Sequence, residues 1–232
     1  TIVFSTSQSK QLVSTVSESE FTSALVRLMN PGARTIYFVT RHGEYSIEGQ
    51  ADDSLSLPAA ELQAKNYTVS SLNLSTLLQI PEDAYVLVIA GQQQSLAAAE
   101  IALIDTYLQS GGGLVVMEEP PILSNIRIED DLLASYLKEN YGIVLGNDIV
   151  LDPVMGSSYD EPFWAVSEQF ANHAISSEML YNTFFPTARS VTTVDVPSTI
   201  NQVGLIMTPD YTWAETDTAS LEDGTAQLDP GT

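Results

Sequence analysis

The chain has 232 residues and is strongly acidic, with 30 Asp and Glu residues against 8 Lys and Arg and a formal net charge of −22. Its hydrophobic fraction of 44% supports a folded globular protein and excludes a disordered one. Negative charge of this size repels phosphate backbones and anionic lipids, which excludes nucleic-acid binding and a basic membrane-docking face. The sequence contains no Cys, so disulfides, thiolate metal sites and Cys nucleophiles are excluded as well.

The beginning of the chain combines a polar arm with a helix. Residues 1–17 are rich in Ser, Thr and Gln, and we expect a flexible N-terminal arm. Ser17 and Glu20 have the spacing of a capping box ahead of apolar residues at helical spacing, and Pro31–Gly32 would end that helix. No apolar run reaches the roughly 20 residues of a membrane helix. With neither a starting Met nor a signal peptide, the sequence reads as a soluble piece of a longer protein.

Strands and helices then alternate along the chain. Apolar and β-branched runs predict strands at 35–40, 67–74, 84–91, 114–117 and 143–151, and helical periodicity predicts helices near 57–65, 95–110 and 129–140. Such alternation is typical of an α/β protein with a doubly wound, mostly parallel sheet. Two further strands are expected at 190–196 and 203–208, where they extend the sheet or cap it. We therefore expect a single α/β domain over 18–232, with a core at 33–152, a C-terminal extension at 153–217 and a loose tail at 218–232.

Sites in open α/β sheets form beyond the carboxyl ends of the strands, and two loops there carry candidate residues. Arg41 and His42 could hold an anion with Glu44 orienting the imidazole, or His42 and Glu44 could tie down a tight turn at Gly43. Residues 91–95, which include Gln92, could bind an anion at a helix start or simply cap that helix. They lack the glycine spacing of a dinucleotide loop.

Two other candidates depend on residues from several segments. Glu118 and Glu119, joined by Glu44 and Asp152, could bind Ca²⁺ or Mg²⁺, or be solvated acids beside a chain reversal. The C-terminal extension offers a further set, for which structural roles in packing are the alternative. This set comprises Asn172, His173, Arg189, Trp213, Ala214 and Glu215.

Known catalytic templates do not fit the sequence. With only two His residues, a His-rich metal site is excluded, and neither a Gly-x-Ser-x-Gly elbow nor a phosphate-binding loop is present. We therefore expect a protein that is not an enzyme and needs no cofactor. An alternative is a carboxylate-dependent hydrolase acting on a carbohydrate or small molecule through Glu44 and Glu118. A third reading is a structural module stabilised by Ca²⁺.

Several segments in order carry a family resemblance. The runs "TIYFVTRHGE", "YTVSSLNL", "IPEDAYVLVIAGQQQSLAAAEIALIDTYLQSGGGLVVMEEP" and "YGIVLGNDIVLDP" resemble the auxiliary-protein family of uncharacterised ABC transport systems, whose best-known relatives are GldG-type gliding-motility components. A eukaryotic intraflagellar-transport module is a more distant relative. The C-terminal runs "NHAI", "FFPTARSV" and "LIMTPDYTWAETD" agree with it. Arg41 replaces the first Gly of the family's Gly-His-Gly-Glu, and Ala174 stands where Pro is usual after His173.

The resemblance implies a function that the residues alone do not. It implies a flavodoxin-like or class I glutamine-amidotransferase-like domain, extracytoplasmic and carried on a membrane-anchored subunit that works with an ABC permease and ATPase. Membrane attachment would depend on segments outside this chain. The expected cleft for an unknown ligand or partner comprises Arg41, His42, Glu44, Gln92, Glu118 and Glu119. Family-motif residues expected to be structural are Gly43, Gly91, His173, Arg189, Trp213 and Glu215.

Overall fold

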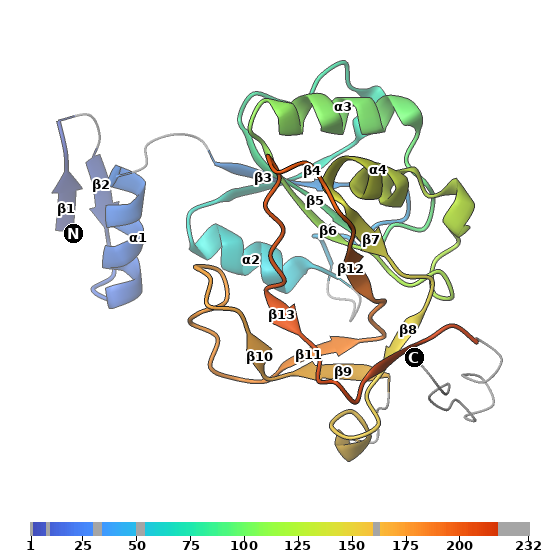
Figure 1. The fold of residues 1–232 in the computed structure, drawn as a ribbon. Helices are drawn as coiled ribbons and strands as arrows, with labels where there is room; N and C mark the ends of the chain where they lie inside the picture. The colour runs from blue at the N-terminus through green and yellow to red at the C-terminus, as the bar shows by residue number, and fades with distance from the viewer. Residues whose placement is uncertain (1, 8–9, 30–33, 50–53, 160–162, 218–232) are drawn as a thin grey trace. The chain divides into compact units, whose positions relative to one another are not determined.

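The computed structural model describes residues 2–7, 10–29, 34–49, 54–159 and 163–217 (Figure 1). The chain forms two compact units, which are described separately. The first unit comprises Thr1–Gln92 and Ala97–Glu118, and the second comprises Gln93–Leu96 and Glu119–Thr232. The domain boundaries expected from the sequence stay a prediction, and the expected tail at 218–232 lies outside the described residues.

A four-stranded parallel sheet is the centre of the first unit. Its strands are β3 (Thr35–Val39), β4 (Thr68–Leu72), β5 (Ala84–Ala90) and β6 (Gly113–Met117), in the order β4-β3-β5-β6. Helix α2 (Ser56–Ala64) connects β3 to β4, and α3 (Ala98–Gln109) connects β5 to β6. The short 3₁₀ helix η1 (Leu74–Thr76) follows β4. These elements confirm the predicted strands at 35–40, 67–74, 84–91 and 114–117 and both helices.

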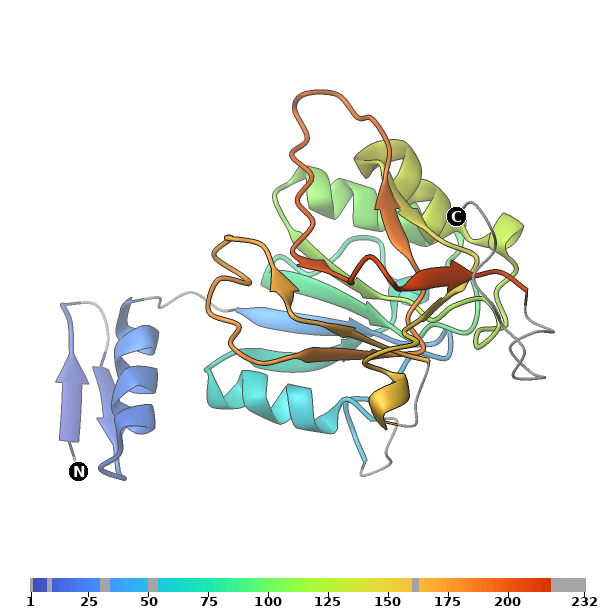
Figure 2. The ribbon, with the colours of Figure 1, turned by 60° about the horizontal axis from the view of Figure 1, so that its bottom comes forward.

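Both faces of this sheet carry buried side chains, which alternate along β5. One face carries a buried cluster of Ile36, Phe38, Val88 and Ala90. Leu62 of α2 packs against that cluster, so α2 covers this face. Leu87 and Ile89 alternate with the cluster and are fully buried on the other face. Figures 1 and 2 show α2 and α3 on opposite sides of the strands, which explains why β5 is an almost continuous apolar run.

The N-terminal segment contains regular structure that the sequence analysis missed. Strands β1 (Ile2–Ser5) and β2 (Lys10–Val13) pair antiparallel, and α1 (Glu18–Met29) follows. The aromatic rings of Phe4 and Phe21 meet edge to face at 5.6 Å between centroids, so the hairpin gains an apolar partner in the helix. Ser17 accepts a hydrogen bond from the Glu20 backbone, as its capping spacing predicts. The expected stop at Pro31–Gly32 lies outside the described residues.

The second unit begins its regular structure with helix α4 (Leu132–Tyr141), which follows a 3₁₀ turn η2 (Ile128–Asp130). The single strand predicted at 143–151 is wrong, because the segment forms β7 (Ile143–Leu145) and β8 (Ile149–Leu151). Between them, the Asp148 carboxylate accepts hydrogen bonds from the backbone and the hydroxyl of Ser190, both at 2.7 Å. These contacts hold a turn that interrupts the strand.

Small antiparallel sheets make up the rest of the second unit. Their strands are β9 (Trp164–Ser167), β10 (Gln169–Phe170), β11 (Thr183–Pro186), β12 (Val191–Thr193), β13 (Ile206–Met207) and β14 (Trp213–Glu215), with a 3₁₀ helix η3 (Ser157–Tyr159). The pairs are β7–β12, β8–β14, β9–β11 and β10–β13. The prediction that residues 143–151 continue the parallel sheet is therefore wrong. Strands predicted at 190–196 and 203–208 are present as β12 and β13, but shorter.

The protein is thus a mixed α/β protein with one parallel sheet and several antiparallel ribbons. Within the part of the chain that the structure describes, no helix is both long and apolar enough to cross a membrane.

Candidate functional site

The candidate site lies at the carboxyl edge of the parallel sheet, by which we mean the loops that follow β3, β5 and β6. The loop after β3 turns sharply, because Arg41 and Gly43 both have positive φ angles, of 95° and 88°. Arg41 is exposed, whereas His42 between them is buried with 8% of its surface exposed. The turn therefore leaves Arg41 at the surface and His42 in the interior, and an anion site at this loop stays a prediction.

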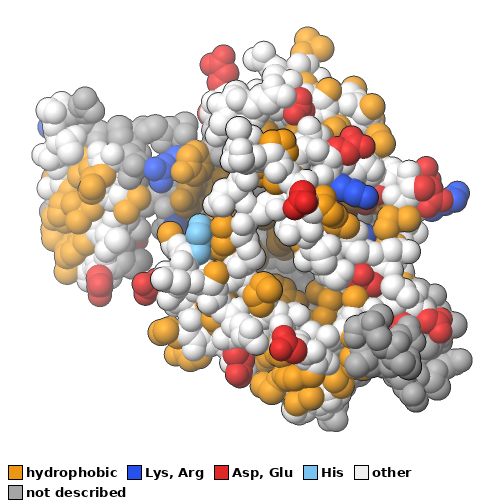
Figure 3. Space-filling model, in the orientation of Figure 1, with side chains coloured by type: hydrophobic (Ala, Val, Ile, Leu, Met, Phe, Trp, Pro, Cys, Tyr) orange, Lys and Arg blue, Asp and Glu red, His pale blue; other side chains and the backbone are white. Residues whose placement is uncertain are grey.

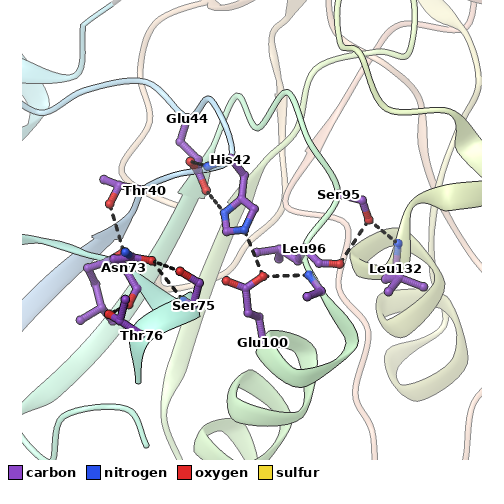
Figure 4. A network of polar contacts seen from close by, with 12 residues as sticks. Thr40, His42, Glu44, Asn73, Ser75, Thr76, Ser95, Leu96, Glu100 and Leu132 are labelled. Atoms are coloured by element: carbon purple, nitrogen blue, oxygen red, sulfur yellow. Dashed lines mark hydrogen bonds and ion pairs between the residues drawn. The ribbon is translucent and has the colours of Figure 1, made fainter. Parts of the chain in front are cut away.

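His42 is held between two carboxylates (Figure 4). Its Nδ1 lies 3.0 Å from Oε1 of Glu44, and its Nε2 lies 3.0 Å from Oε2 of Glu100. The His42 backbone N–H also donates to Oε2 of Glu44 at 2.7 Å. Each ring nitrogen of His42 thus has its own carboxylate as hydrogen-bond partner. Both expected roles of Glu44, orienting the imidazole and tying down the loop, are met by the same contacts.

Glu100 is the residue that the sequence analysis did not anticipate. It lies in the first turn of α3 with 3% of its surface exposed, and its Oε2 also accepts from the Ala97 backbone N–H at 2.8 Å. Ser95, the last of the residues 91–95 that could cap this helix, instead contacts Asp130 and Leu132 within the second unit through its hydroxyl. The other oxygen of Glu100, Oε1, is buried and has no hydrogen-bond partner among the residues that the structure describes.

A second polar pair joins the ends of β5 and β6. The amide Nε2 of Gln92 donates to Oε1 of Glu118 at 2.5 Å, and Gln92 is 1% exposed. Its amide oxygen is buried and has no partner. Gly91, just before it, has φ +67°, and a Cβ there would lie 2.4 Å from the Tyr45 ring. Glycine is therefore required for the chain to leave β5 beside that ring.

The polar side chains at this edge form hydrogen bonds mainly with one another. Glu44 uses both carboxylate oxygens on His42, Glu118 is bonded to Gln92, and both ring nitrogens of His42 are engaged. A nucleophile or general base needs a free atom directed at a substrate. The contacts instead fix the loop after β3 to the start of α3, and the end of β5 to the end of β6.

The candidate residues of the second unit have structural contacts. Arg189 is 8% exposed and donates to the backbone carbonyls of Gly146, Glu119 and Leu145 at 2.7, 3.4 and 3.5 Å. It thereby connects β7 and its turn to the segment before β12. Glu119 belongs to this unit, whereas Glu118 belongs to the first.

Asp152 and Glu215 are likewise occupied by backbone groups. Asp152 is fully buried and accepts from the backbone N–H groups of Val154, Met155 and Val166. Glu215 accepts from the Asp217 backbone at 2.8 Å and from the Trp213 indole at 3.5 Å. In the loop after β10, Nδ1 of His173 accepts from the Ile175 backbone at 3.2 Å. No group of three or more Asp, Glu or His side chains in the described ranges could hold a metal ion.

Comparison with known proteins decides the family. A family model described as "ABC-type uncharacterized transport system", which represents auxiliary components of such systems, matches residues 33–231. The chain belongs to this auxiliary ABC-transport family. The match includes all the segments that carried the resemblance and extends over parts of both units. It indicates an auxiliary component of an ABC-type transport system that has other components.

One solved structure supports the fold of this family member. The structure titled "mmIFT52 N-terminal domain" matches with a TM-score of 0.59 and 22% sequence identity, over 77% of this chain and 74% of that one. At this identity, the likeness shows the fold alone. No curated protein matches the chain.

Proposed function

We propose that this chain is an extracytoplasmic, non-catalytic binding domain on a membrane-anchored subunit of an ABC-type transport system of the GldG-like, gliding-motility kind. Its partners would be the permease and ATPase subunits, and a membrane anchor would lie outside this chain. The observation that carries the proposal is the Glu44–His42–Glu100 contact, together with the family match. Each ring nitrogen of His42 and both oxygens of Glu44 are engaged within this contact, which suits a rigid surface better than a reaction centre.

The binding surface that we propose is the carboxyl edge of the first unit. In doubly wound, flavodoxin-like sheets, which we take this sheet to be, ligands and partners meet the protein at this edge. Exposed Arg41 stands on a loop that the buried His42 holds in one conformation, so the edge is preorganised. A preorganised loop loses little conformational freedom on binding, which favours affinity.

Site-specific photo-crosslinking in intact cells tests this surface. A photoreactive residue at Arg41 should crosslink to a transport-system subunit. The matched control is Glu82, which is also exposed and lies before β5, at the opposite edge of the same sheet, and it should give no such product. Crosslinking from Glu82 but not Arg41 would reject the carboxyl edge as the surface.

Protease protection tests the location. A protease added to intact cells with a permeabilised outer layer should cleave the domain if it is extracytoplasmic. Resistance until the cytoplasmic membrane is broken would reject that location.

A further inference from the structure

A pocket in the second unit lies beside an unpaired strand edge. It has a volume of about 410 Å³, within the range of about 300–1,000 Å³ of ligand-binding pockets. Its walls are mainly apolar and come from four antiparallel ribbons. Phe185, Ile206, Met207 and Trp213 supply the large side chains. Val191 and Met207 line the pocket while 63% and 55% exposed, so the pocket opens to solvent.

The register of β12 shows which of its backbone groups face outward. Gly146 donates to the Ser190 carbonyl, and Val194 donates to the Gly142 carbonyl, both at 2.8 Å. Hydrogen-bonded positions alternate in an antiparallel pair, so Thr192 also faces β7. The N–H and C=O groups of Val191 and Thr193 therefore point away from β7. Among the described residues they have no other backbone partner, and all three β12 residues are exposed.

An outward row of backbone donors and acceptors beside an apolar pocket is the pattern used to bind an extended peptide by strand addition. We propose that β12 adds a strand from a partner protein, which inserts an apolar side chain into the pocket. Unprotected strand edges are normally covered or charged in stable proteins, whereas β12 carries only Val, Thr and Thr. This inference concerns the second unit and does not depend on the carboxyl edge of the first.

Charge determines the kind of peptide. The net charge of −22 makes edge-to-edge pairing of two copies of this chain unfavourable and repels acidic partners. Figure 3 shows acidic side chains scattered over one face of the molecule, with few basic ones. The pocket is lined by no Asp or Glu, and its one charged lining residue is Arg189, which is 8% exposed and donates to backbone carbonyls. The inserted side chain therefore meets walls that are mainly apolar. The fitting partner is therefore an extended peptide with an apolar centre and basic flanks.

Fluorescence anisotropy with a synthetic peptide tests the proposal on the whole chain. The probe is a capped peptide in which Thr alternates with Leu and Val between two pairs of Lys. We expect saturable binding that weakens as salt rises, because flanking charges contribute. The same peptide with N-methylated amides on its pairing edge should lose at least about tenfold in affinity. Equal binding of the methylated peptide, or no binding at about 1 mM, would overturn the proposal.

Two variants of Val191 distinguish the contribution of its backbone N–H to peptide binding from that of its side chain. Val191→Pro removes the outward N–H, and proline is tolerated on an edge strand whose N–H faces solvent. It should weaken binding at least about tenfold, whereas Val191→Ala, which keeps the N–H, should change it less than about threefold. Equal affinities of the two variants would contradict strand addition. Thermal melts of both confirm that they fold, and the methylated peptide gives an independent test on the unmodified chain.

Discussion

Glu100 connects two parts of the first unit through one side chain. It joins the loop after β3 to the first turn of α3 by contacting His42 and the Ala97 backbone. A buried charged group that loses its partner is expensive, because the remaining group keeps its desolvation cost without compensation. We therefore expect the contacts of Glu100 to stabilise the folded first unit as well as to hold the loop after β3 in place.

Replacing Glu100 tests this coupling. Glu100→Ala leaves the His42 ring and the Ala97 N–H without their acceptor and should lower the free energy of unfolding by about 3 kcal/mol. Glu100→Gln retains an acceptor oxygen and should cost less. Urea unfolding measures both, with Glu82→Gln at an exposed position as the control, expected within about 0.5 kcal/mol. Equal losses in the Ala and Gln variants would contradict a hydrogen-bonding role.

Gly91 allows a comparison of two glycines that share a left-handed backbone. Gly91→Ala combines an unfavourable φ of +67° with a Cβ placed 2.4 Å from the Tyr45 ring. Gly111→Ala meets the same kind of backbone strain at φ +95° but has no atom within 4 Å. We expect Gly111→Ala to cost about 1 kcal/mol and Gly91→Ala at least about 2 kcal/mol more, by denaturant unfolding. Similar costs would show that Tyr45 moves aside freely.

Tyr37 and Asp83 give a pH-dependent contribution at the other edge of the sheet. Burial raises the pKa of Tyr37, and the hydrogen bond and negative charge of Asp83 raise this pKa further. The folded state therefore holds the phenolic proton more tightly than the unfolded state. The resulting stabilisation is full below pH about 10 and is lost as pH rises through the folded-state pKa.

Asp83→Asn should lower the pKa of Tyr37. The pKa of Tyr37 is measured by ultraviolet titration of the unmodified protein and of Asp83→Asn. Subtracting the titration curve of the same protein carrying Tyr37→Phe removes the signal of the other tyrosines. Tyr37→Phe should also reduce the loss of stability above pH about 10. An unchanged Tyr37 pKa in Asp83→Asn would contradict the contribution of the carboxylate.

At the scale of elements, Arg189 organises the β7 turn by donating to three backbone carbonyls. Lysine offers one ammonium in place of a planar fork, so Arg189→Lys leaves buried carbonyls unsatisfied and should cost about 2 kcal/mol. The control is Arg127→Lys, whose side chain is 74% exposed in its ion pair with Glu129 and which should change stability by less than about 0.5 kcal/mol. Faster amide exchange at β7 in Arg189→Lys would localise the effect. Equal costs at the two positions would contradict the role of Arg189.

The strands differ in how far the sequence could reveal them. β5 is buried on both faces and reads as a continuous apolar run, so its limits were predictable to one residue. β10 has two residues, too short for any alternation to be recognised. β13 has two residues as well and forms only part of the strand predicted at 203–208. The break between β7 and β8 depends on contacts of Asp148 with Ser190, which lies 42 residues away. Local patterns carry no information about such a partner.

The candidate site was predictable only in part, because local sequence patterns reveal contacts between neighbouring residues but not between distant ones. His42 and Glu44 are two residues apart and follow a clear strand, so their pairing could be anticipated. Glu100 lies 58 residues from His42, and the helical periodicity around it predicts a helix but no contact with His42. A signal was present, because Glu100 is the only charge in the apolar stretch from Leu96 to Ile104. The apolar pocket of the second unit had no such signal, since four ribbons distant in sequence build its walls.

At the scale of the whole molecule, the net charge and the family are both consistent with a component that binds partners. An acidic chain with its reactive side chains engaged internally belongs to a family of auxiliary transport components. Its two units offer distinct surfaces, a rigid carboxyl edge in the first and a free strand edge in the second. Both are suited to holding partners.

The most direct measurement is affinity purification of the tagged full-length protein from crosslinked membranes of its own organism. The account predicts that an ABC permease and its ATPase are recovered with it. Recovery from the soluble fraction without transport subunits would contradict the account.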